Sequence, residues 1–184
     1  MPQSEVEHWV FAYGSLMWDP GFPVVEMVKA QIRGFSRRFC LLSVVHRGTI
    51  DMPGLALALD EDAGGCCAGL ALRVAPNHWD TTLNQMRERE LVTNAYREEI
   101  VPLHLAGGRV VDAVTYVTRR EHNQYVGALS LEEQARIIAY ASGGRGPNYD
   151  YLFNTTRHLA EIGLAAPVLE DLARQVGAIL QRIQ

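Results

Sequence analysis

Apolar residues in the first half of the chain fall into short runs that predict β-strands. The run over 6–13 is apolar almost throughout, which indicates a central strand covered on both faces. Further strands are expected over 37–45, 54–60 and 67–75. The segment 61–65, "EDAGG", is rich in turn-forming residues and is expected to form the turn between the last two strands.

Two later apolar runs, 96–105 and 109–117, flank an Ala-Gly-Gly sequence at 106–108 and predict a hairpin. Because Pro102 has no backbone N–H to donate, the first arm is expected to be an edge strand or to carry a bulge.

Helix start and stop signals mark the second half of the chain. Ser130 followed by Glu133 fits a capping box at the start of one helix. The next helix covers 149–163 and stops at its glycine, and Pro167 begins a last helix that runs to the C-terminus. The pattern therefore predicts the α+β class, with a mixed, largely antiparallel, barrel-like sheet and packed helices.

Another helix, predicted over 76–91, carries an acidic residue on its apolar face. Three apolar side chains share that face: Trp79, Leu83 and Met86. The next position of the same stripe is Glu90, which lies about 20° from Trp79 around the helix axis. Glu88 lies about 180° away, on the solvent side.

The inward position of Glu90 has structural and functional explanations. The last helical turn can already be exposed, or the carboxylate can pair with Arg87 or Arg89. Alternatively, Glu90 lies in a pocket, where loss of solvent raises its pKa and makes it available to accept and donate protons.

Composition and charge narrow the classes of function. The chain has 184 residues, 48% of them hydrophobic, which predicts one globular domain over 1–184. A net charge of −4 argues against nucleic acid as the main partner. No run approaches the roughly 20 apolar residues of a membrane helix, and no apolar signal core is present, so we expect a cytoplasmic protein without membrane contact. The sequence leaves the oligomeric state open.

Several common types of site have no signature in the sequence. The three cysteines, Cys40, Cys66 and Cys67, form no disulfide framework, and the six histidines show no metal-ligand spacing, so neither metal nor cofactor is expected. The segment 143–148, "GGRGPN", lacks the dinucleotide fingerprint and is expected to be a loop. Ser15 follows a glycine but precedes none, so it does not fit a nucleophile elbow.

Arg47 lies in "HRGT" at the end of a predicted strand. It is either a solvated charge at a strand end or a ligand for a substrate carboxylate, which a guanidinium can bind with two parallel hydrogen bonds.

Four stretches of this chain together resemble the ChaC-type γ-glutamylcyclotransferases, in particular their glutathione-specific branch. They are "YGSLMWDPGF" at 13–22, "RRFCLLSVVHRGTIDMPG" at 37–54, "REREL" at 87–91 with Tyr96, and "ASGGRGPNYDYLFNT" at 141–155. In that family the catalytic glutamate stands six positions before a tyrosine, and counting back from Tyr96 gives Glu90. The chain departs from the family pattern at three positions: Arg87 replaces an aromatic residue, Leu91 a methionine and Asn94 a glycine.

The resemblance implies a γ-glutamylcyclotransferase-like fold and cofactor-independent cleavage of glutathione into 5-oxoproline and Cys-Gly. Glu90 would be the general base and acid. The expected substrate-binding residues are Tyr13, Gly14, Ser15, Leu16, Arg47, Tyr96 and Tyr151, and Gly14 to Leu16 would supply backbone N–H groups. Arg37 and Arg38 are weaker candidates than Arg47 for binding a substrate carboxylate.

Two other functions fit the same residues. One is a cyclotransferase for other γ-glutamyl amino acids or amines, and the other is a non-catalytic γ-glutamyl-binding module.

Overall fold

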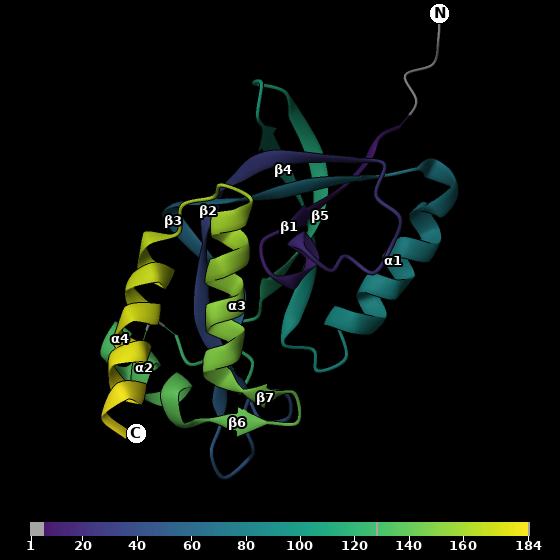
Figure 1. Cartoon of the computed structure of the whole chain (residues 1–184). Helices are drawn as coiled ribbons and strands as arrows, with labels where there is room; N and C mark the ends of the chain where they lie inside the picture. The colour runs from purple at the N-terminus through teal and green to yellow at the C-terminus, as the bar shows by residue number, and fades with distance from the viewer. Residues whose placement is uncertain (1–5, 128, 184) are drawn as a thin grey trace, which may run out of the picture. The chain divides into compact units, whose positions relative to one another are not determined.

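The computed structural model describes residues 6–127 and 129–183 (Figure 1). The chain divides into two compact units. The first contains the described residues up to Arg37 together with Leu59–Arg119, and the second contains Arg38–Ala58 together with the described residues after Arg119. The single domain expected over 1–184 stays a prediction, and the two units are described one at a time.

Five strands close into a barrel in the order β1-β3-β2-β4-β5. They are β1 (His8–Ala12), β2 (Glu26–Ser43), β3 (Gly54–Val74), β4 (Tyr96–Leu105) and β5 (Val110–Thr118). β1 lies antiparallel to β3 and parallel to β5, and β4 is antiparallel to both β2 and β5. The predicted α+β class with a mixed, largely antiparallel barrel is therefore confirmed.

The core of the first unit fills this barrel with alternating inward side chains. The largest of them, including Trp9, Phe11 and Leu103, are no more than 1% exposed. β1 is central, as predicted, since it pairs with β3 from His8↔Val74 to Ala12↔Leu70 and with β5 at Trp9↔Ala113. Its C-terminal end therefore leaves the barrel at a fixed point.

The expected turn at 61–65 is wrong, because β3 runs without interruption from Gly54 to Val74. Gly65 lets the backbones of β3 and β2 come close together, because a Cβ at this position would lie 2.6 Å from the carbonyl oxygen of Phe35.

β2 is also longer than predicted. Its first half alternates buried and exposed positions, with Ala30 and Ile32 inside, and this short-period signal was missed.

The hairpin of β4 and β5 and the helix after β3 agree with prediction. Gly107 and Gly108 have φ values of 101° and 91°, which only glycine adopts easily. Helix α1 covers Pro76–Glu90 and lies beside the barrel strands of the first unit.

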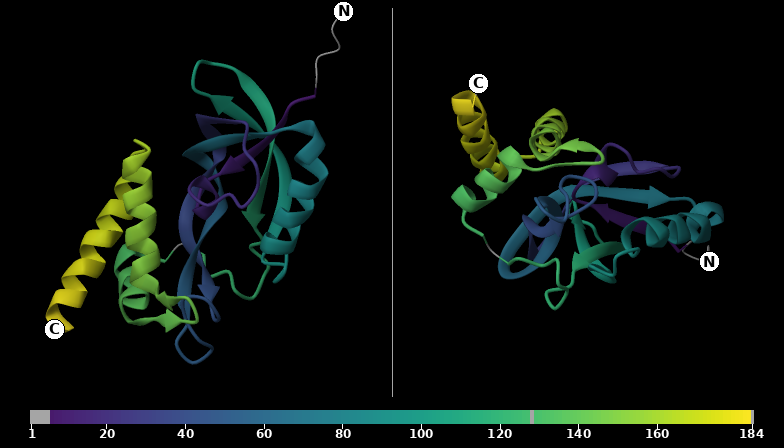
Figure 2. Two further views of the ribbon diagram at one scale, coloured as in Figure 1. Left: turned by 45° about the vertical axis from the view of Figure 1, so that its right-hand side comes forward. Right: turned by 90° about the horizontal axis from the view of Figure 1, so that it is seen from below.

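The second unit contains three helices that pack against one another (Figure 2). They are α2 (Leu131–Tyr140), α3 (Asn148–Glu161) and α4 (Pro167–Ile183). The predicted capping box at Ser130 and Glu133 is present. The segment expected to be a loop at 143–148 instead contributes to a two-stranded ribbon, β6 (Ser142–Gly143) and β7 (Gly146–Pro147), which precedes α3.

Among the described residues, no helix combines the length and the apolar character needed to cross a bilayer. The three cysteines form no disulfide with one another, and Cys40 is fully buried.

Candidate active site

The loop after β1 is a single turn of 3₁₀ helix, η1 (Ser15–Met17). Leu16 and Met17 are 8% and 3% exposed, so their side chains anchor the turn in the first unit. The N–H groups of Met17 and Asp19 donate to the carbonyls of Gly14 and Ser15 and close the turn. The apolar residues around the glycine and serine therefore hold the loop in place.

The start of this turn leaves backbone donors available. Within the described part of the chain, no hydrogen bond uses the N–H group of Gly14, Ser15 or Leu16. Backbone N–H groups without an internal partner at the start of a turn can donate to a bound group.

Tyr13 fixes the point where the chain leaves β1. Its hydroxyl donates to the carbonyl of Tyr116 at 2.9 Å, and its own carbonyl accepts from Nε of Arg37 at 2.6 Å. Tyr13 is thus an anchor of the loop.

Glu90 is the last residue of α1 and continues the inward stripe of that helix, as predicted. Of the predicted stripe, Met86 is 2% exposed, whereas Leu83 and Trp79 are half-buried. Trp79 stacks on His8 with a ring separation of 4.7 Å. Thr82, on the same side of the helix, is 1% exposed. The side chain of Glu90 is 20% exposed. Its neighbour Glu88 is exposed, in agreement with the helical geometry.

Arg89 joins Glu90 to the loop after β1. Its Nε lies 3.4 Å from Oε1 of Glu90, and its Nη2 donates to Oγ of Ser15 at 2.6 Å. Its Nη1 donates to the carbonyl of Asp19 at 3.2 Å. One guanidinium therefore lies between the carboxylate and the glycine-serine turn. Sequence reasoning considered Arg89 only as an ion-pair partner and missed its contact with the loop.

The pKa of Glu90 is raised by burial, and the positive charge of Arg89 lowers it only in part. Burial penalises the ionised form, so Glu90 holds a proton more strongly than an ordinary glutamate does. A carboxyl group with a raised pKa is suited to take up a proton and return it.

A second carboxylate nearby has the opposite environment. Glu98 on β4 accepts two hydrogen bonds from Arg87, at 2.8 and 2.7 Å, and one from the hydroxyl of Tyr116 at 3.0 Å. The hydrogen bonds from Arg87 hold the pKa of Glu98 below its ordinary value. The pKa of Tyr116 is raised, first by burial and then by the charge of Glu98, so its hydroxyl stays protonated.

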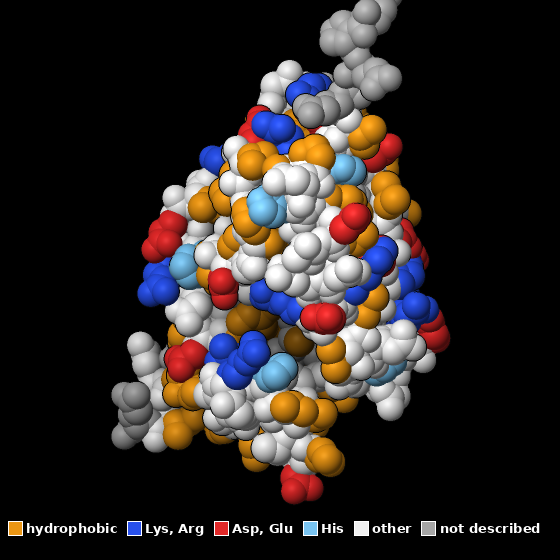
Figure 3. All heavy atoms as spheres, turned by 90° about the vertical axis from the view of Figure 1, so that its right-hand side faces the viewer, with side chains coloured by type: hydrophobic (Ala, Val, Ile, Leu, Met, Phe, Trp, Pro, Cys, Tyr) orange, Lys and Arg blue, Asp and Glu red, His pale blue; other side chains and the backbone are white. Residues whose placement is uncertain are grey.

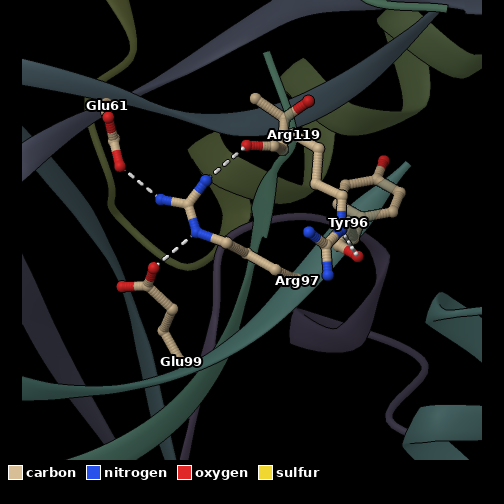
Figure 4. Close-up of polar contacts among 6 residues, drawn as sticks. Glu61, Tyr96, Arg97, Glu99 and Arg119 are labelled. Carbon is tan, nitrogen blue, oxygen red and sulfur yellow. Dashed lines mark hydrogen bonds and ion pairs between the residues drawn. The ribbon is translucent and has the colours of Figure 1, made fainter. Parts of the chain in front are cut away.

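Tyr96 begins β4 and is partly buried. Its carbonyl accepts from Nε of Arg119 at 3.3 Å, a contact drawn in Figure 4. The next residue, Arg97, donates to Glu99 at 2.5 Å, to the carbonyl of Thr118 at 3.1 Å, and to Glu61. These contacts hold the start of β4 in place, and the predicted role of Tyr96 toward substrate stays a prediction.

The remaining predicted site residues, Arg47 and Tyr151, lie in the second unit. The guanidinium of Arg47 lies 5.4 Å from the ring centre of Tyr151, and its Nη1 donates to the carbonyls of Arg145 at 2.7 Å and Pro147 at 3.2 Å. Arg47 thus holds the β6–β7 ribbon, and its predicted role as a carboxylate ligand stays a prediction.

Asn148, from the last motif, is fully buried and has a structural role that sequence reasoning missed. Its amide donates to the carbonyl of Leu55 at 2.9 Å and accepts from the N–H of Leu55 at 2.7 Å. The Asn148 side chain thus satisfies both backbone groups of Leu55, as the backbone of a neighbouring strand does in a sheet.

A family model described as "ChaC-like protein" matches residues 8–179. The chain belongs to the ChaC-like family.

Curated relatives and solved structures agree with this membership. The glutathione-specific γ-glutamylcyclotransferase of Escherichia coli (strain K12) is 35% identical, over 94% of this chain and 74% of its own length. γ-Glutamylcyclotransferase 2-3 of Arabidopsis thaliana is also 35% identical, over 94% and 89% of the two chains. The crystal structure of a γ-glutamyl cyclotransferase specific to glutathione from yeast superimposes with a TM-score of 0.83 at 25% identity, covering 95% of this chain and 100% of that one.

Two of the positions at which this chain is expected to depart from the ChaC-type pattern have clear local surroundings. Arg87 makes the ion pair with Glu98. Asn94 has a φ of 56° in the turn between α1 and β4. Asparagine is one of the few residues other than glycine that visits this left-handed region readily.

Proposed function

We propose that this ChaC-like chain splits glutathione into 5-oxoproline and Cys-Gly by an intramolecular reaction that needs no cofactor. The names of its relatives support the substrate, since those from Escherichia coli and Homo sapiens are glutathione-specific γ-glutamylcyclotransferases. The observation that carries the proposal for this chain is the largely buried carboxylate of Glu90, joined through Arg89 to the loop after β1.

The reaction begins with a proton transfer. The α-amine of the γ-glutamyl group arrives as an ammonium and must lose a proton before it can attack, and Glu90 accepts that proton. The amine nitrogen then forms a bond to the γ-carbonyl carbon, and the carbonyl oxygen becomes an oxyanion. Holding the two groups of one molecule close together supplies a large part of the rate enhancement.

The oxyanion requires hydrogen-bond donors that are already in place. The N–H groups of Gly14, Ser15 and Leu16 are the donors we assign, because the described structure gives them no other partner. Preorganised backbone donors stabilise charge that develops in the transition state, and loss of one costs about 10²–10³ in turnover.

Collapse of the intermediate completes the reaction. The bond between the γ-carbon and the cysteine nitrogen breaks as Glu90 returns its proton to the leaving amine. The ring nitrogen releases its second proton, which the free amine of Cys-Gly takes up, so the reaction consumes no net proton. No water is consumed and no covalent enzyme intermediate forms, so one carboxyl group with a raised pKa serves both steps. Tyr13 and Leu16 hold the loop, and Arg47, Tyr96 and Tyr151 remain predicted substrate contacts.

The test is to incubate the purified protein with reduced glutathione and to quantify both Cys-Gly and 5-oxoproline. Equal amounts of the two products are expected. A panel of other γ-glutamyl amino acids and amines, assayed in parallel, measures the substrate preference. Thermal stabilisation by glutathione without product release would favour a binding module and contradict the proposal.

The face drawn in Figure 3 does not favour nucleic-acid binding. On the face that includes α1, acidic and basic side chains lie intermixed among apolar ones, without a continuous basic field (Figure 3). The net charge of −4 agrees with a small molecule as the proposed partner.

A further inference from the structure

Arg37 lies in the first unit, next to the place where β1 and β3 stop pairing. The ladder between these strands ends at Ala12↔Leu70. Just beyond it, Nε of Arg37 donates to the carbonyl of Tyr13 at 2.6 Å, and Nη2 donates to the carbonyl of Ala68 at 2.5 Å. A single guanidinium thus bridges one carbonyl from each of the separating strand ends.

The bond to Tyr13 also determines the direction of the next N–H group. A trans peptide is planar, so the carbonyl of Tyr13 and the N–H of Gly14 point in opposite directions. No cis peptide bond occurs in the described chain. When Arg37 fixes the carbonyl on one side of this peptide, it fixes the Gly14 N–H on the other side, and that N–H has no partner among the described residues.

We propose that Arg37 is a positioning residue that orients and polarises the Tyr13–Gly14 peptide, so that the Gly14 N–H donates to the oxyanion. This inference rests on the proposed cyclotransferase function. Arg37 touches no reacting atom and acts only through the peptide. A positive charge donating to the carbonyl also draws electron density from the N–H, because hydrogen bonds in a chain strengthen one another.

An arginine suits this position better than a lysine does. The planar guanidinium presents several donors at fixed angles and can reach two carbonyls at once. The ammonium of a lysine is a compact point charge that can bind one of these two carbonyls well but not both. Two nitrogens of Arg37 already donate to backbone carbonyls, which makes Arg37 less suited to bind a substrate carboxylate.

The experiment compares Arg37→Met and Arg37→Lys with the wild type. Turnover of reduced glutathione gives kcat, and calorimetry in a Glu90→Gln background, where turnover is blocked, gives the Kd for glutathione. We expect Arg37→Met to lower kcat about 10- to 100-fold, less than outright loss of an oxyanion donor. The Kd should change less than about threefold, because the oxyanion exists only in the transition state. Arg37→Lys should retain an intermediate kcat.

Two control variants separate positioning from folding. Arg33→Met removes an exposed arginine from the same strand and should leave kcat and Tm unchanged. Val101→Ala, in the core of the first unit, should lower Tm while kcat per folded molecule stays at the wild-type value. If Arg37→Met does not fold, Arg37→Lys decides the question.

Three results would overturn the inference alone while the proposed function stands: wild-type kcat in Arg37→Met, wild-type kcat in Arg37→Lys, or a loss confined to glutathione binding. A wild-type protein that releases no 5-oxoproline would overturn the proposed function and this inference together.

Discussion

Two carboxylates of the first unit, Glu98 on β4 and Glu90 at the end of α1, have opposite electrostatic environments. On β4, Glu98 accepts a two-pronged pair of hydrogen bonds from Arg87 and a third bond from Tyr116. At the end of α1, Glu90 has a single arginine, Arg89, at 3.4 Å. The pKa of Glu98 is lowered by its partners, whereas burial raises the pKa of Glu90.

The difference arises because two arginines of one helix, α1, pair with their carboxylates in different ways. Arg87 of α1 forms an ion pair with Glu98 of β4, and this pairing favours the ionised form of Glu98. Two residues later the same helix provides Arg89, which divides its donors between Glu90, Ser15 and Asp19. The charge on Glu90 is therefore only partly compensated, and an incompletely compensated buried acid retains a high affinity for protons.

The largest effect is expected from Glu90→Gln, which keeps the shape of the side chain but cannot carry a proton. Release of 5-oxoproline from reduced glutathione should fall by about 10²–10⁴. Since the amide removes a charge whose burial is unfavourable, Tm should not fall. The matched control is Glu88→Gln, which changes an exposed acid of the same helix and should keep turnover within about twofold. Equal damage from both variants would show that the assignment of Glu90 is wrong.

A smaller effect is expected from Arg89→Met. Arg89 lowers the pKa of Glu90, so its loss should raise that pKa further. Glu90 must be ionised to accept the first proton, so the acid limb of the kcat/KM profile should move to higher pH. We expect turnover at neutral pH to fall by about tenfold, in part because Ser15 loses its partner. An unchanged acid limb would contradict the electrostatic coupling.

The smallest effect on activity is expected from Glu98→Gln. Turnover should stay within about fivefold of the wild type, while Tm falls by a few degrees because the ion pair with Arg87 is weakened. The pKa of Glu98 is lower in the folded state than in the unfolded chain, so its contribution to stability is lost as pH falls through the folded-state pKa. The Tm difference between variant and wild type should therefore shrink on acidification. A Glu98→Gln variant as inactive as Glu90→Gln would remove the distinction between the two acids.

The sequence predicted those parts of the fold that depend on local signals. The capping box at Ser130 and the hairpin glycines 107–108 are local, and both were found. The 61–65 segment was misread because Gly65 allows close contact with Phe35 of β2, and only the strand pairing reveals that. The site divides in the same way. Helical periodicity placed Glu90 on the inward face, but Arg37 and Arg89 reach residues distant in sequence, and no pattern along the chain specifies such contacts.

The most direct test of the central claim is to titrate the Glu90 carboxyl itself. Carbon-13 NMR of glutamate-labelled protein, with Glu90→Gln to assign the signal, gives its pKa, and the pH dependence of kcat/KM for glutathione gives the kinetic one. Glu90 is expected to titrate above the range of ordinary glutamates, and the acid limb of kcat/KM is expected at the same pH. An ordinary pKa for Glu90, or an acid limb that does not coincide with its titration, would contradict the central claim.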